Sequence, residues 1–82
     1  MGYINKIALR PNIEIANGSE SITFIQTATT FKIEDVNFAT EYFNPVTGLF
    51  DDQKSTLYFE SGESLLIEQS FATTKNELNA LN

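Results

Sequence analysis

Apolar and polar residues alternate along most of this chain, which is the pattern of β-strands with one buried face. The clearest stretch, Ser55 to Gln69 (STLYFESGESLLIEQ), predicts a hairpin. A bulged loop over Glu60 to Gly62, closed by Gly62 in the left-handed conformation, places Leu57 opposite Leu65. This register gathers the apolar residues of the hairpin on one face: Leu57, Phe59, Leu65 and Ile67. A two-residue turn would split that set between the faces, so we predict the bulged loop.

The same alternation predicts a series of short strands before this hairpin. Pro11 is expected to end the first of them, because proline has no amide N–H to donate to a sheet. Asn17-Gly18 has the composition of a tight hairpin turn, and Glu34-Asp35 interrupts the pattern further along. The predicted strands are Tyr3 to Leu9, Asn12 to Ala16, Ser21 to Gln26, Thr29 to Ile33 and Val36 to Phe43.

Asn44 to Lys54 (NPVTGLFDDQK) breaks the alternation and predicts the one long loop of the chain. Leu49 and Phe50 form an apolar pair within it, followed by Asp51 and Asp52. Such a pair is either packed back over the sheet or offered to a partner, and both readings are open at this point. We therefore take Leu49, Phe50, Asp51 and Asp52 as the candidate partner-binding residues.

After the hairpin the apolar period lengthens to three and four residues, which predicts a helix from Ser70 to Leu81. Ser70 is the expected N-cap. The helix should pack on the sheet through Phe71, Leu78 and Leu81. Residues 1–82 are thus expected to form a single mainly β domain, a small antiparallel sheet or barrel of five to six strands with one short C-terminal helix.

Charge and composition exclude several classes of function. The 82-residue chain has 11 acidic and 5 basic residues and a net charge of -6. The basic residues are scattered, so we expect no direct binding of nucleic acid or of anionic membranes. Lys6 and Arg10 interrupt the N-terminal apolar run, which argues against a secretory signal or a membrane span, and we expect a cytoplasmic protein.

The chain has no histidine and no cysteine, so imidazole and thiolate chemistry, and the zinc sites that depend on them, are not possible. An enzyme would have to work with carboxylates alone, for which Glu34-Asp35 and Asp51-Asp52 are the candidates. Adjacent acids in turns are usually solvated, and Asp51-Asp52 lacks the ligand spacing of a calcium loop. We expect a protein that is not an enzyme and holds no metal or cofactor.

The run Phe31-Lys32-Ile33-Glu34-Asp35-Val36, followed by Thr56 to Glu63 and by Glu68-Gln69-Ser70 at a helix entry, resembles a recurrent small β domain. Residues 24–81 are similar to flagellar FlbD-type proteins, to the first half of LytTR DNA-binding domains and to short open reading frames of tailed phages. This resemblance implies a fold. The chain ends before the basic half of a LytTR domain, so DNA binding is carried over to no residue here.

A chain of this size buries only about 63% of its unfolded surface, and it has no disulfide to stabilise it. Apolar residues on both faces of several strands leave surface for a subunit contact. We therefore expect a non-catalytic domain that binds itself as a homo-oligomer and another protein, as a phage accessory or virion protein. The alternative is an acidic inhibitor that mimics phosphate charge, which requires one shared acidic surface. That surface would consist of Glu34, Asp35, Asp51, Asp52, Glu60 and Glu63.

Overall fold

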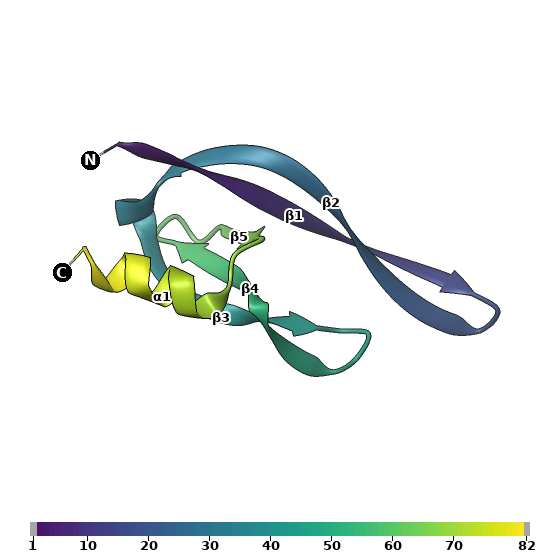
Figure 1. Cartoon of the computed structure of the whole chain (residues 1–82). Coiled ribbons are helices and arrows are strands. Elements are labelled where there is room, and N and C mark those ends of the chain that lie inside the picture. The colour runs from purple at the N-terminus through teal and green to yellow at the C-terminus, as the bar shows by residue number, and fades with distance from the viewer. Residues whose placement is uncertain (1, 82) are drawn as a thin grey trace.

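The computed structural model describes residues 2–81 as one open antiparallel sheet with a helix packed on it (Figure 1). The elements are β1 (Tyr3–Ala16), β2 (Ser19–Lys32), a 3-10 turn (Ile33–Asp35), β3 (Val36–Asn44), β4 (Leu49–Phe59), β5 (Ser64–Ile67) and α1 (Phe71–Asn79). The order across the sheet is β2-β1-β5-β4-β3. This confirms the predicted mainly β fold with a C-terminal helix, and the sheet keeps two free edges rather than closing into a barrel.

The β4–β5 hairpin has the predicted register. Leu57 lies opposite Leu65. The loop is closed by the N–H of Gly62, which donates to the carbonyl of Phe59 at 2.9 Å, and Gly62 has a φ of 95°. The N–H of Phe59 in turn donates to the carbonyl of Glu63. The bulged loop is therefore confirmed, because these two bonds set Phe59 opposite Glu63.

The core lies on the inner face of this hairpin. Leu57 and Ile67 are fully buried there, each 1% exposed. They pack with Phe31 from β2 and Val36 from β3, so β2, β3 and the β4–β5 hairpin meet at one cluster. Phe31 also makes an edge-on contact with Phe59, with the ring centroids 5.5 Å apart. The apolar face predicted for Ser55 to Gln69 is the centre of the fold.

β1 and β2 form one long hairpin, so the prediction that Pro11 ends a strand is wrong. The turn residues Asn17 and Gly18 both have positive φ, which makes a tight turn with Ala16 and Ser19 hydrogen-bonded across it. Hydrogen-bonded and non-bonded pairs alternate from there, so Pro11 falls in a non-bonded pair and its nitrogen faces away from β2. No ladder bond is lost, and the strand continues through the proline.

β3 departs from simple alternation. Its pairing with β4 is irregular between Val36 and Phe38, and the extra residue reverses the side-chain direction beyond it. Val36 and Ala39 consequently face the core, whereas Phe38 is half exposed and stacks on Tyr58 with the centroids 4.6 Å apart. The alternation predicted for Val36 to Phe43 would place Val36 and Phe38 on one face, and this prediction is wrong because of the extra residue.

α1 begins as predicted. The hydroxyl of Ser70 accepts the N–H of Thr73 and caps the first turn. Leu78 packs against the core cluster, while Leu81 stays largely exposed. The most buried helix residue is Thr74, a polar residue that lies on the same helical period as Phe71 and Leu78. Its hydroxyl lies 2.7 Å from that of Ser55 on β4, so the helix is held to the sheet partly by a buried polar contact.

Replacing Gly62 with valine is expected to lower the free energy of unfolding by about 1 to 2 kcal/mol, because a β-branched residue is strained at positive φ. A Cβ atom at this position would meet no atom within 4 Å, so the expected cost comes from the backbone conformation. Chemical denaturation of the two proteins measures it. An unchanged midpoint would contradict the role assigned to the loop.

Candidate functional site

The candidate residues lie on a hairpin rather than on a long loop. β4 begins at Leu49, so only residues 45–48 connect it to β3. The side-chain oxygen of Asn44 accepts the N–H groups of Val46 and Thr47, and the N–H of Gly48 donates to the carbonyl of Asn44 at 2.8 Å. These bonds close the turn locally. The prediction that Asn44 to Lys54 forms an eleven-residue loop is therefore wrong, because Asn44 is the last residue of β3 and Leu49 to Lys54 belong to β4.

Leu49 and Phe50 are exposed to solvent at the end of this hairpin. They are 67% and 65% exposed. Phe50 lies opposite Phe43 on β3, and the two rings make an edge-on contact with centroids 5.3 Å apart. Neither residue is packed back over the sheet, so that reading of the apolar pair is wrong, and the binding of a partner stays a prediction. We call Phe43, Leu49 and Phe50 the hairpin tip.

Asp51 and Asp52 do not continue the hairpin tip as a free acidic pair. Asp51 accepts from the ammonium of Lys54 at 2.9 Å and from the N–H of Gln53 at 2.8 Å. The bond from Lys54, followed by that from Gln53, lowers the pKa of Asp51. Asp52 accepts from the side-chain amide of Gln53. These contacts fit the pairing of β4, since Glu41 lies opposite Ser55 and Tyr42 opposite Asp51, which leaves Asp52 to Lys54 as a bulge.

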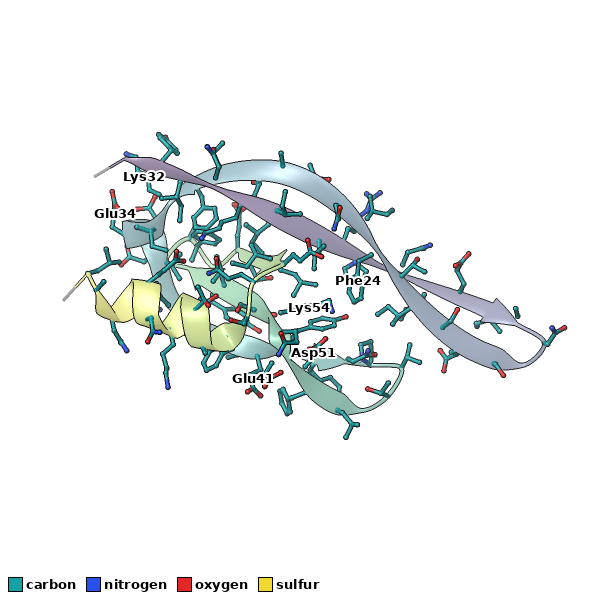
Figure 2. All side chains as sticks on the ribbon, viewed as in Figure 1. Phe24, Lys32, Glu34, Glu41, Asp51 and Lys54 are labelled. Carbon is teal, nitrogen blue, oxygen red and sulfur yellow. The ribbon has the colours of Figure 1, made fainter. Side chains whose placement is uncertain are left out.

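Lys54 joins the two hairpins of the molecule. Its ammonium lies 4.7 Å from the centre of the Phe24 ring on β2, while it also pairs with Asp51 (Figure 2). Phe24 makes an edge-on contact with Tyr42 on β3, with centroids 5.7 Å apart. Burial raises the pKa of Tyr42, in part against the nearby charge of Lys54. The contacts among Lys54, Phe24 and Tyr42 thus hold the β1–β2 and β3–β4 hairpins together, and the exposed ends of the two hairpins begin beyond them.

The outer half of the β1–β2 hairpin is a second exposed apolar surface, which the candidate residues did not include. Ile13 lies opposite Ile22 on one face of the ribbon, and Ile15 is 73% exposed near its end. β5 meets β1 only around Ala8, so the ribbon has no third strand beyond that point. The alternation of Ile13 and Ile15 was the available signal. Their exposure could not be predicted, because it depends on the length of the hairpin, and the strand was expected to end at Pro11.

The six acids of the alternative function divide into two groups. Glu60 donates its N–H to the carbonyl of Asp35, so the β4–β5 loop and the 3-10 turn meet at one end of the sheet. Asp51 and Asp52 lie toward the other end of β4, near the β3–β4 turn. The arrangement therefore lacks the single acidic surface that a phosphate mimic requires. Within residues 2–81 no group of three or more carboxylates is placed to hold a metal ion.

Comparison of the chain with protein-family models, with curated proteins and with solved structures finds no match. The resemblance to FlbD-type and LytTR domains accordingly stays a prediction. No helix in the described part of the chain is long and apolar enough to cross a membrane. The two exposed hairpin ends, joined at Lys54, are the features on which a function can be argued.

Proposed function

We propose that this protein is a non-catalytic interaction domain that associates with itself and binds a further protein through its two exposed hairpin ends. The observation that carries this proposal is that the accessible surface exceeds that of a compact monomer of this mass, with exposed apolar residues at the turn end of each of the two hairpins, β1–β2 and β3–β4. In Figure 1 the β1–β2 and β3–β4 turns project from the same side of the sheet, away from the chain termini. The two apolar surfaces can therefore engage a partner that approaches from that side.

The shape supports the proposal. The Cα radius of gyration is 13.8 Å and the extents are 49 × 22 × 21 Å. A compact domain of this length has a radius of gyration of about 11.7 Å. The outer half of the β1–β2 hairpin thus lies far from the centre of the domain and does not pack on the core cluster. Such extensions are typical of proteins in which they pack against another subunit.

The surface area supports it in the same way. The accessible surface is 5500 Å², against about 4,900 Å² for a compact monomer of 9.2 kDa. The difference of roughly 600 Å² approaches the ~800 Å² that each partner buries in an interface of standard size. The exposed aromatic side chains at the hairpin tip, Phe43 and Phe50, are of a residue type that is enriched in such interfaces.

The similarity to short open reading frames of tailed phages supports a narrower form of the proposal, in which the domain is a phage accessory or virion protein. Both the general proposal and this narrower form require that the protein associates with itself. This association is tested by sedimentation velocity on the purified protein over a range of micromolar concentrations. A monomer at high micromolar concentration contradicts self-association.

Replacing Phe50 with alanine tests the hairpin tip. Truncating an aromatic anchor at an interface typically costs 2 kcal/mol or more, so association should weaken at least about thirtyfold. The melting temperature should barely change, because Phe50 is largely solvent-exposed. Sedimentation equilibrium of the wild type and the variant measures the difference.

Phe38→Ala is the matched control for that experiment. Phe38 is also an exposed aromatic residue, 51% exposed, but it lies on β3 away from the hairpin tip and stacks on Tyr58. It should leave association unchanged. Equal weakening by both variants would show a general effect of aromatic surface, and a large loss of stability in Phe50→Ala would show that Phe50 belongs to the core.

A further inference from the structure

The outer edge of β2 is a long strand edge with no neighbour in the sheet. β2 is the first strand in the sheet order and comprises 14 residues. Between Glu20 and Lys32 it contains no charged residue and no proline. Natural proteins usually protect such edges with charges, prolines or bulges, because unpaired N–H and C=O groups pair readily with another strand. β2 has none of these devices along its central part.

The other free edges are protected. β3, at the opposite end of the sheet order, is irregular at two places, next to Phe38 and next to Tyr42. The side of β1 that faces away from β2 is open beyond β5, but Pro11 lies there with its nitrogen directed outward. Because the edges of β3 and β1 are protected, the unprotected edge of β2 is a specific property of that strand.

The direction of the β2 backbone follows from the turn. Ser19 is hydrogen-bonded across the turn to Ala16, so odd-numbered residues of β2 direct their N–H and C=O groups toward β1 and even-numbered residues direct theirs outward. The carbonyl of Ile7 agrees with this alternation. Ile7 lies opposite Ala28, and its carbonyl turns away from β2 to accept the N–H of Glu68 at 2.9 Å.

We propose that the partner at this edge is a second copy of the chain, whose β2 pairs antiparallel with this one and is centred on Gln26. The proposal rests on the self-association proposed above and adds to it a contact through the β2 edge, beside the contact of the hairpin tip that Phe50→Ala tests. An antiparallel pair of identical strands is self-complementary about a two-fold axis. With Gln26 at the axis, outward-directed even residues face each other along the whole edge.

Charge selects this register. Glu20 and Lys32 are equally distant from Gln26 along the strand, so Glu20 of each copy lies opposite Lys32 of the other. Both ends of the paired edge are then closed by opposite charges, and β2 itself has no charged residue between them. At the axis, the side-chain amide of each Gln26 donates to the carboxylate of Glu68 in its own copy. Opposite charges directly across a strand pair stabilise it, whereas like charges there destabilise it. This matters for a chain with a net charge of -6, since two copies otherwise repel each other.

The pairing also supplies what the β1–β2 hairpin lacks. A two-stranded ribbon is marginally stable in water, and a third strand with an apolar face stabilises it. In the proposed register the outer half of each ribbon lies along the inner half of the partner's β2. Thr23 then faces Thr29 of the second copy, a β-branched pair that suits a sheet.

Single-cysteine variants test the register, because the natural chain contains no cysteine. Gln26→Cys should form a disulfide-linked dimer on mild oxidation, since residues at the axis lie about 5.5 Å apart between Cα atoms. Thr23→Cys alone should not, because its two copies are roughly 20 Å apart in this register. An equimolar mixture of Thr23→Cys and Thr29→Cys, in which only the mixed pair is adjacent, should cross-link. Cross-linking of Thr23→Cys by itself, with none for Gln26→Cys, overturns the register.

A charge exchange tests the same register without cysteine. Glu20→Lys and Lys32→Glu should each weaken dimerisation about tenfold by placing like charges opposite each other at both ends, and the double variant should restore it. Far-UV circular dichroism checks that each variant is folded. If the wild type dimerises but neither set of variants behaves as stated, edge pairing is wrong while self-association stands. If the wild type is a monomer, both are wrong.

Discussion

Leu57→Ala is expected to lower the free energy of unfolding by about 3 kcal/mol. Leu57 is 1% exposed and packs in the cluster with Phe31, Val36 and Ile67. Removing a buried leucine side chain forfeits its transfer free energy and leaves a cavity, which together cost about 2 to 5 kcal/mol. Urea denaturation followed by circular dichroism gives the difference. A domain of this size has only about 4 to 12 kcal/mol of stability to lose.

Leu49→Ala is the matched control, because it is the same substitution in the same strand. Leu49 lies at the exposed start of β4. Its truncation should change the free energy of unfolding by no more than about 0.5 kcal/mol. Similar losses for both variants would mean that β4 does not have one buried end and one exposed end, and would contradict the placement of the hairpin tip at the surface.

Thr74→Val is expected to cost about 2 kcal/mol although it keeps the shape of the side chain. The hydroxyl of Thr74 accepts from the side-chain amide of Gln69 at 2.9 Å and lies 2.7 Å from the hydroxyl of Ser55. Both hydroxyl residues are buried, and Ser55 also donates to the carbonyl of Gln69. Valine would remove one of the two hydrogen-bond partners of the buried Ser55 hydroxyl and one of the two of the Gln69 side-chain amide, which costs about 1 to 3 kcal/mol in all. Thermal and chemical denaturation measure the loss.

Thr74→Ser and a double-mutant cycle with Ser55→Ala provide the control. Serine retains the hydroxyl, so it should be milder than valine even though it removes a methyl group. The combined Ser55→Ala and Thr74→Val variant should lose less than the sum of the single losses, because the two residues share one contact. Additive losses would show that the hydroxyls do not interact.

The turns and caps of this protein could be predicted because each is decided by a few neighbouring residues. Asn17-Gly18 adopts positive φ at low cost, Gly62 does so in the bulged loop, and Ser70 satisfies the first N–H groups of α1. The register of the β4–β5 hairpin followed from the alternation itself, since any other register would have divided its apolar face. These features require no knowledge of the rest of the chain.

The candidate site was predicted only in part. Leu49 and Phe50 were found because they form an apolar pair beside a glycine and two acids. Their exposure, and the contact of Phe50 with Phe43, follow from the pairing of β4 with β3. The ion pair of Asp51 with Lys54 could not be predicted either, because it depends on a bulge in that pairing. A polar run such as Asp51 to Lys54 has low β-propensity and reads as a loop until its partner strand is known.

The β4–β5 hairpin with its buried face, the turn at Asn17-Gly18 and the helix could be predicted from the sequence, because they depend on local conformation and on a period of two. The length of the β1–β2 hairpin, the β3–β4 hairpin and the way these units combine depend on the tertiary structure. Pro11 is accepted within β1 because its nitrogen faces the side where β5 has already ended. Lys6 is held by Gln69 and Glu77, which are 63 and 71 residues away. Such contacts arise from the packing of distant segments, whose free energy depends on all the segments at once and leaves no periodic signal in the chain.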